Sequence, residues 1–556
     1  MKTALRLSKR NPICAFVIIA VLAVRTGHAH EEPVHQQITL SAFRSSAGIN
    51  VFLSDQLGAP PTSFTVGPVL RTRSSDYPQS RSDSPAGWLS WGAYMEDDED
   101  PPVHSVHFLR SSDHFYAVLH TPKWLTDGRE TWGKLPDHLT ESYTWATSPG
   151  MAGPDMDKTF AGPNRHTWQD ARDKQFDALT LPAKADRDAA LALTLYALGH
   201  VLHLNQDLSQ PDHVRNDEHV PRSSVLFRDG KHWIEEYGLR YLADSKKAGT
   251  LDTTFPLQPR GWAYWRSEGF RTLKSFWDRG KYTGSTAALD ADAAQTSGEK
   301  LGLAEYSNGN FIGEDAIYAE RFPQKDSDRS LHYFPFPTLL GSTTFGGIAA
   351  NMAPHVRQVV FDDGTTANRL FVDKVANGIH LRNHSAVCYH ADKDRSRPPS
   401  STLYVATTIQ DTNVLWSYHT NLVRKAIEYS AGIIDYFFRG ALEVSLDTVP
   451  GDHHRLHIVN RSGQTLKGGN FILFVEDAYT SVRTLHPMTV TWDNTLSTLA
   501  DGVGIDATFD SPRNKFVLVY KGTIGWNGSP TTGSVDDSID ENVGVASVVF
   551  IYDPPV

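Results

Sequence analysis

Histidine and carboxylate side chains recur at short spacings in the segment Leu198–Asp217, which reads LGHVLHLNQDLSQPDHVRND. His203 is followed four residues later by Asp207, and His213 comes six residues after that, behind a Ser-Gln-Pro break. Residues at positions i and i+4 of a helix share a face, with Cβ atoms about 5–6 Å apart. Imidazole and carboxylate groups are ordinary zinc ligands. The spacing therefore predicts a hydrolytic metal site, in which zinc activates water.

A second imidazole–carboxylate pair follows downstream, where His232 precedes Glu236 by four residues. A helix is expected from Lys231 to Asp244, which would place both side chains on one face. Two such pairs on facing helices can build a buried zinc site. The sequence holds no G-x-S-x-G elbow and no phosphate-binding loop of the G-x4-G-K-[ST] type, so the usual rival hydrolase motifs are missing.

Further ligand-type residues lie upstream, in and after an acidic run that begins at Glu96 and includes Asp97. The run as a whole is interpreted as a solvated turn, with one carboxylate directed inward. Asp97 and its neighbour Asp98 are the alternatives for that carboxylate. The histidine that would accompany it is His114, with His104 and His107 as competitors.

The first helix of the site must extend over Asp186–Leu208. Its residues at steps of three or four are apolar at Ala189 and Leu193 and become polar towards His203 and Asp207. Burying unpaired charge is costly, so such a polar end needs partners, and metal ions can serve both residue types. His200 is expected to support a ligand or the core rather than to bind metal itself.

The N-terminal 29 residues are typical of a secretory signal: a basic start, an apolar run over Ile13–Val24 and small residues before a cleavage site after Ala29. An uncleaved anchor helix is the alternative. Cleavage would make His30 the first residue, and its α-amine together with His35 could bind zinc. A secreted or periplasmic protein is expected.

Composition limits the class of protein. A chain of 556 residues with 40% hydrophobic and 21% charged residues predicts a globular protein of two or three domains. The net charge of -11 disfavours a broad nucleic-acid-binding face, so no stable nucleic-acid partner is expected. After the signal there is no apolar run of about 18 residues, so no transmembrane helix is expected in the mature chain. With Cys14 in the signal, Cys388 would have no partner for a disulfide.

The periodicity predicts a mainly α domain over residues 30–440, followed by an all-β, sandwich-like domain over residues 441–556. A long helix is expected from residue 412 to about residue 438, because apolar residues recur at helical spacing. Loop structure is expected over residues 44–88, and a short hairpin around Gly364 within a mixed region. After Gly440 the pattern alternates and predicts six or seven strands, with His453 and His454 in a turn between them.

The ordered segment His203-x3-Asp207-x5-His213 … His232-x3-Glu236 resembles the zinc-dependent phospholipase C and single-strand nuclease superfamily, in particular its secreted bacterial members. GAYMED (92–97) is similar to the family's segment with an aspartate ligand, and RSSDHFY (110–116) to its His-Phe-Tyr segment. GLAEYSNGNF and AIEYSAGIIDYFF resemble later helices of the family. The resemblance covers roughly residues 30–440.

This resemblance implies up to three zinc ions in a helical cleft, all held by histidines, carboxylates or the N-terminus. One ion would be held by Asp97, His114, His203 and Asp207. A second would be held by His213, His232 and Glu236. The third would lie between Asp207 and the mature N-terminus, with His35 and the α-amine and carbonyl of His30. The family usually has tryptophan at that first position, so His30 is a departure. Asp97 would also orient or deprotonate the nucleophile.

The expected activity is hydrolysis of a phosphodiester, first of all phospholipase C activity that releases a phosphorylated head group from a phospholipid. The C-terminal domain could contact a membrane surface. A single-strand nuclease or nucleotidase on the same metal core is the first alternative, and it would need aromatic side chains that stack on bases. A secreted binding protein with purely structural zinc is the second.

Overall fold

The computed structural model describes residues 32–57, 84–97, 112–126, 139–151, 164–216, 234, 238, 255–284, 300–311, 313, 352–360, 366–376, 379–390, 404–408, 411–448, 453–492, 497–510, 515–525 and 544–551. The predicted signal, His30, and the pair His232 and Glu236 lie outside these residues, as do the alternative ligands Asp98, His104 and His107. What was predicted for them stays a prediction.

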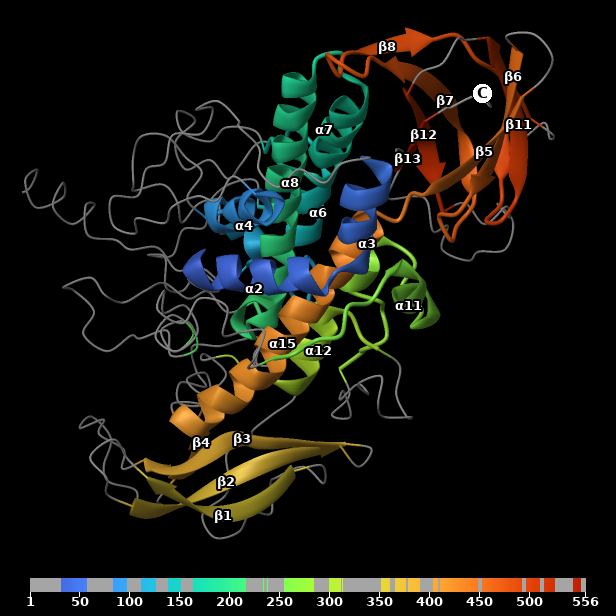
Figure 1. Cartoon of the computed structure of the whole chain (residues 1–556). Helices are drawn as coiled ribbons and strands as arrows, with labels where there is room; N and C mark the ends of the chain where they lie inside the picture. Colours follow the sequence, from blue (N-terminus) through green and yellow to red (C-terminus); the bar gives the residue numbers. More distant parts are fainter. Residues whose placement is uncertain are drawn as a thin grey trace, which may run out of the picture.

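Helices make up the described chain as far as residue 311, and one more precedes the C-terminal strands (Figure 1). They are α2 (Glu32–Ser45), α3 (Ala47–Val51), α4 (Pro85–Met95), α6 (Ser142–Thr147), α7 (Trp168–Thr180), α8 (Lys184–Gln206), α11 (Trp262–Ser267), α12 (Leu303–Asn310) and α15 (Thr412–Phe437). Short helical turns lie at Phe52–Gln56, Ser112–His114, Asp207–Ser209, Asp212–Val214 and Leu273–Phe276. Helix α8 packs against α4 and α7, while α15 packs against α2.

Two glycines allow α4 and α8 to cross at very short distance. A Cβ atom on Gly92 would lie 2.0 Å from the Tyr196 carbonyl oxygen, and one on Gly199 would lie 2.2 Å from that of Leu89. Real Cβ atoms do not approach other atoms so closely, so any side chain here would push the helices apart. This crossing holds the end of α4 next to the last turns of α8.

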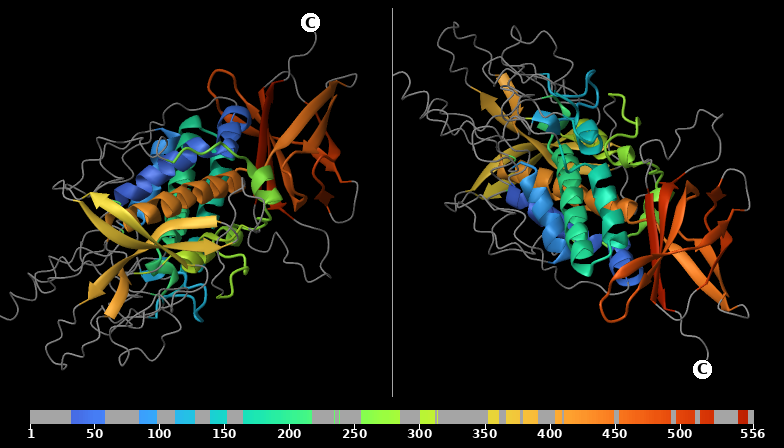
Figure 2. Two further views of the ribbon diagram at one scale, coloured as in Figure 1. Left: turned by 90° about the horizontal axis from the view of Figure 1, so that it is seen from below. Right: turned by 90° about the horizontal axis from the view of Figure 1, so that it is seen from above.

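Helix α15 agrees with the prediction for residues 412–438. Asp411 caps its first turn, because the side chain accepts a hydrogen bond from the Asn413 N–H at 2.8 Å. The helix is amphipathic and most of its side chains are buried, including Ile427, Ile433 and Ile434. It runs from the four-stranded sheet within residues 352–408, at one end of the molecule, to the C-terminal sheets (Figures 1 and 2).

A four-stranded antiparallel sheet lies where the sequence predicted only a short hairpin. Its strands follow chain order: β1 (Met352–Val360), β2 (Thr366–Ala376), β3 (Ile379–His390) and β4 (Tyr404–Thr408). Strands β1 and β2 pair as a hairpin around the predicted position, so that prediction is confirmed. The other two strands of the sheet were not predicted. Phe371 and Leu381 belong to the main helical core, so this sheet packs on the helices.

The C-terminal strands form two antiparallel sheets that face each other (Figure 1). The strands are β5 (Leu442–Thr448), β6 (His453–Asn460), β7 (Leu466–Glu476), β8 (Arg483–His486), β9 (Thr489–Thr491), β10 (Thr498–Leu499), β11 (Gly504–Asp510), β12 (Lys515–Ile524) and β13 (Gly544–Ile551). One sheet has the order β10-β7-β12-β13 with β8 paired to β7, and the other has the order β5-β6-β11-β9. The predicted succession of a helical part and an all-β part is confirmed in this outline.

Strand β12 shows why the larger sheet has two buried faces. Phe516, Leu518 and Tyr520 point into the core between the two sheets, whereas Val517 and Val519 join the helical core. Alternating side chains of one strand lie on opposite faces of a sheet, so both faces of β12 are covered. The C-terminal part is therefore packed against the helices rather than separate from them.

Two local predictions were wrong. Residues 44–88 were expected to be loop, but α3, a helical turn at Phe52–Gln56 and the start of α4 lie there. His453 and His454 were expected in a turn, but both belong to β6 and pair with β11. Helix α7 and strand β11 were not predicted at all. No helix in the described ranges combines the length and the apolar character needed to cross a membrane.

Candidate metal centre

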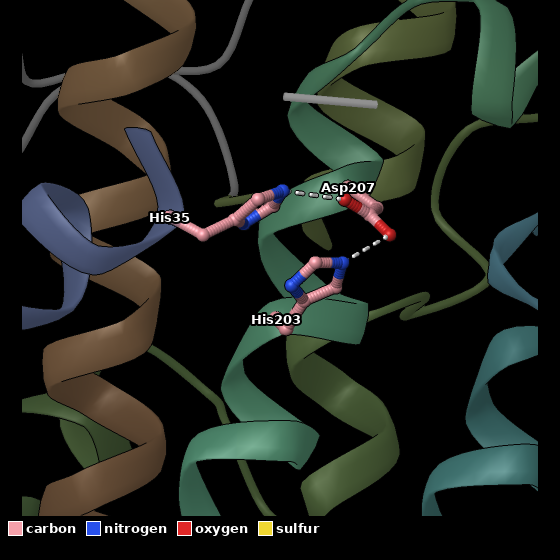
Figure 3. A group of neighbouring side chains, drawn as sticks. All are labelled: His35, His203 and Asp207. Atoms are coloured by element: carbon pink, nitrogen blue, oxygen red, sulfur yellow. Dashed lines mark ion pairs between the residues drawn. The ribbon is translucent and has the colours of Figure 1, made fainter. Parts of the chain in front are cut away.

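Five predicted ligands converge at the last turns of α8. His203 and Asp207 come from α8 and the turn that follows it, His35 from α2, Asp97 from the end of α4, and His114 from the turn Ser112–His114. Their exposed fractions are between 0% and 1%. Figure 3 shows His35 reaching across from α2 towards Asp207, with His203 beside it. The convergence brings together four chain segments that are far apart in the sequence.

Asp207 is the centre of the cluster, because its two oxygens face different partners. Oδ1 lies 3.1 Å from His35 Nε2. Oδ2 lies 2.7 Å from His114 Nδ1 and 3.3 Å from His203 Nε2. A carboxylate in this position can bridge two ions, one on each oxygen.

Asp97 provides the second carboxylate. Its oxygens lie 3.5 Å from His114 Nδ1 and 3.3 Å from His203 Nε2. The His35 and His203 rings stack at 3.7 Å between centroids, and the His114 ring meets the His203 ring edge-on at 5.0 Å. Two overlapping sets result, His35–His203–Asp207 and Asp97–His114–His203, whose ligand atoms all lie within 4.8 Å of one another in each set.

The tautomer of His203 is set by its contact with α4. Its Nδ1 lies 2.6 Å from the carbonyl oxygen of Ala93, which only accepts hydrogen bonds, so Nδ1 carries a proton. In the neutral ring Nε2 then carries a lone pair, and this lone pair points at the carboxylates of Asp97 and Asp207. A lone pair facing a carboxylate is repulsive unless a proton or a metal ion lies between them.

His35 is held in the same way by Gln206. The Gln206 amide donates to Thr39 Oγ1 at 2.9 Å and to Ser430 Oγ at 3.1 Å, which leaves its Oε1 turned to His35. His35 Nδ1 donates to that oxygen at 2.8 Å. In the neutral ring, His35 Nε2 therefore carries a lone pair that faces Asp207, as Nε2 of His203 does.

The carboxylates of the cluster attract positive charge, either as protons on the imidazoles or as metal ions. Burial lowers the pKa of His203, but the attraction of Asp207 and Asp97 outweighs burial and holds this pKa well above its ordinary value. Burial also lowers the pKa of His114, yet hydrogen bonding to Asp207 and its charge raise that pKa to about 9. Burial and the neighbouring His203 lower the pKa of His35.

The carboxylate responds in the opposite direction. Burial raises the pKa of Asp207, but the surrounding imidazoles outweigh it and hold this pKa well below its usual range. Asp207 thus stays ionised, and positive charge must lie beside it as protons or as metal. The nitrogen and oxygen ligands present, and the two lone pairs directed at carboxylates, fit a metal ion of the zinc type. These buried groups could hold a metal; that they do so stays a prediction.

His213 lies close to the cluster but makes different contacts. Its Nδ1 lies 3.3 Å from the carbonyl oxygen of His114, and its ring stacks on Phe115 at 4.2 Å. The turn that carries it is anchored by Arg215, which donates to the carbonyls of Asn308 and Phe311. Its predicted partners lie outside the described residues. Asp212, next to His213, is buried as well.

Two buried polar residues of the site were not predicted. Gln206 orients His35, and nothing in its sequence spacing distinguishes it from a surface glutamine. Glu96 directly precedes Asp97, and was passed over as part of the acidic run. Its Oε1 accepts a hydrogen bond from Trp145 Nε1 at 2.9 Å and lies 3.6 Å from His114 Nε2, while its Oε2 contacts His200 Nδ1. His200 thus supports the site, as expected.

Comparison with protein-family models, with curated proteins and with solved structures yields no match for this chain.

Proposed function

We propose that this protein is a secreted or periplasmic zinc-dependent phosphodiester hydrolase, most directly a phospholipase C, with the fold of the phospholipase C and single-strand nuclease superfamily. The observation that carries the proposal is the buried convergence of His35, Asp97, His114, His203 and Asp207. The sequence order and residue types of these ligands resemble those of the family.

Each residue would have a defined part. One ion would be held by His114, His203, Asp97 and Oδ2 of Asp207. Oδ1 of Asp207 and His35 would supply two of the ligands of a second ion. Zinc in these positions would act as a Lewis acid and make water nucleophilic near neutral pH, as phosphodiester hydrolysis requires. Asp97 would orient the attacking water and accept its proton. His30, His213, His232 and Glu236 complete the proposed set.

A substrate panel with metal analysis tests this proposal. Purified mature protein with zinc is incubated with phosphatidylcholine vesicles, vesicles of other head groups, and single-stranded DNA and RNA. Release of diacylglycerol is expected, together with zinc in the protein. Cleavage of oligonucleotides alone would point to the nuclease alternative. Bound zinc with no turnover of any substrate would point to a binding protein with structural zinc.

A further inference from the structure

Each imidazole of the cluster has one nitrogen on the carboxylate side and one nitrogen held from outside. For His203 the outer partner is the Ala93 carbonyl oxygen, and for His35 it is the Gln206 amide oxygen. His114 Nε2 faces the carboxylate of Glu96 at 3.6 Å, a distance of an ion pair rather than of a direct hydrogen bond. Among these outer partners only Glu96 is a carboxylate.

We propose that Glu96 is a positioning residue for the metal ligand His114: its buried carboxylate orients the imidazole and keeps the proton on Nε2, so that Nδ1 is presented to the metal. This inference rests on the proposed metal site. With a cation on the Nδ1 side, the ring proton would lie on Nε2, which faces the Glu96 carboxylate. A carboxylate behind a ligating imidazole also raises the basicity of the ligand.

The surroundings of Glu96 hold it rigidly in this position. Trp145 Nε1 donates to Oε1 at 2.9 Å, and His200 Nδ1 contacts Oε2. The side chains of Glu96 and His200 are fully buried, and Trp145 is 1% exposed. His200 is itself fixed, because His166 stacks on it at 4.4 Å and Tyr196 meets it edge-on at 4.7 Å. Three elements, α4, α6 and α8, thus meet at one carboxylate.

The position on the chain adds to the argument. Glu96 and Asp97 are consecutive at the end of α4, yet they serve opposite sides of the same imidazole. Asp97 lies 3.5 Å from His114 Nδ1, and Glu96 lies 3.6 Å from His114 Nε2. In a solvated acidic turn, neither carboxylate would be buried against a histidine. Two buried carboxylates on opposite sides of His114 fit a site in which the orientation of this ring is fixed.

The test compares wild type with Glu96→Gln, which keeps the shape and the oxygen acceptor for Trp145 but removes the charge. Zinc affinity is measured by competition with a chelating dye, and the visible spectrum is recorded with cobalt(II) in place of zinc. We expect roughly 10–100-fold weaker zinc binding and a changed cobalt spectrum. Thermal unfolding in the presence of chelator serves to compare the metal-free folds.

Glu428→Gln is the matched control, because Glu428 is a buried carboxylate with polar partners away from the cluster. It should lower stability and leave zinc affinity and the cobalt spectrum unchanged. Wild-type zinc affinity and an unchanged cobalt spectrum in Glu96→Gln would overturn the inference. If Glu96→Gln does not fold, Glu96→Asp replaces it: it retains the charge at a greater distance, and unchanged zinc affinity there would equally overturn the inference. If wild type itself binds neither metal, the proposed function fails and this inference with it.

Discussion

Two buried carboxylates in the helical part of the molecule, Asp207 and Glu428, have opposite kinds of surroundings. Glu428 on α15 accepts hydrogen bonds from Lys300 Nζ at 2.6 Å and from Arg260 Nη1 at 3.1 Å. Both partners are N–H donors, so the carboxylate acceptor is matched by donors. Asp207 is met by imidazole nitrogens instead, and in His35 and His203 the proton is already committed to an outer partner.

The difference distinguishes a structural ion cluster from a candidate metal site. Burial raises the pKa of Glu428, but attraction by Lys425 and Lys300 outweighs it and lowers this pKa to about 2, so the protein supplies the balancing charge by itself. Around Asp207 the balancing charge must be imported as protons or as metal. Buried polar residues are therefore best judged by whether donors and acceptors match, and burial alone does not decide their role.

Replacing Asp207 is expected to have the largest effect. Asp207→Asn removes the carboxylate that both sets of imidazoles share, so zinc binding and hydrolysis should both be lost. We expect kcat/KM to fall by roughly 10³-fold or more, since a metal site supplies several kcal/mol of transition-state stabilisation. Zinc should stabilise wild type by about 4 kcal/mol at a thousandfold excess over Kd. It should not stabilise the variant, as urea unfolding with and without zinc would show. Equal activity in both proteins would refute the role given to Asp207.

Replacing Glu428 is expected to cost stability without any connection to metal. Glu428→Gln leaves Lys300, which is almost completely buried, without its charge partner. Breaking one side of a buried ion pair typically costs about 3–5 kcal/mol. Urea unfolding should show this loss equally with zinc and with chelator. A loss that appears only with zinc would mean that the two carboxylates do not differ as described.

The pH dependence of stability should also distinguish the ion cluster around Glu428 from the cluster around Asp207. The folded-state pKa of Glu428, about 2, is depressed below its ordinary value of 4.5. Its stabilising contribution is thus complete above about pH 5 and is lost as pH falls towards 2. The full contribution corresponds to roughly 3 kcal/mol. Unfolding free energies of chelator-treated wild type and Glu428→Gln should converge between pH 5 and about pH 2. Parallel curves over this range would contradict the assignment.

The smallest expected effect comes from adding a methyl group at a closely packed glycine. Gly199 near the metal centre and Gly432 away from it should respond differently in zinc binding. In Gly199→Ala the new Cβ would lie 2.2 Å from the Leu89 carbonyl oxygen, whereas in Gly432→Ala it would lie 2.5 Å from the rings of Phe276 and Trp265. Both should cost about 1–3 kcal/mol by overpacking. Only Gly199→Ala displaces α4, whose Ala93 carbonyl holds His203, so only this variant should bind zinc more weakly, by about tenfold. Dye competition and urea unfolding on both variants provide the comparison.

Part of the site could be predicted because two of its ligands follow the helical repeat. His203 and Asp207 lie at positions i and i+4 of a helix whose apolar stripe was visible, and α8 lies within two residues of the predicted range at either end. No spacing connects His35 and His114 to α8: His35 was predicted from its closeness to the expected N-terminus, and the resemblance then implied both as ligands. Glu96 could not be distinguished from the acidic residues after it, because its burial depends on Trp145 and His200, which are distant in sequence.

The β-structured regions were predicted less completely, for a physical reason. Alternation predicts a strand only where one face is buried, and Leu442–Leu446 displayed it clearly. Strand β11 alternates too, with Ile505, Ala507 and Phe509 buried, but its small and acidic residues were interpreted as a connection. Strands β1 to β4 depend on pairing with one another, which a single sequence does not display. Propensity is therefore weaker evidence for strands than for helices.

The most direct test of the central claim is metal content after equilibrium dialysis. Wild type and Asp207→Asn are dialysed against buffered zinc, and bound zinc is measured by elemental mass spectrometry, with Glu428→Gln as the control. We predict stoichiometric zinc in wild type and in Glu428→Gln, and a large loss of bound zinc in Asp207→Asn. Wild type without zinc, or Asp207→Asn with as much zinc as wild type, would contradict the account of this cluster as a metal centre.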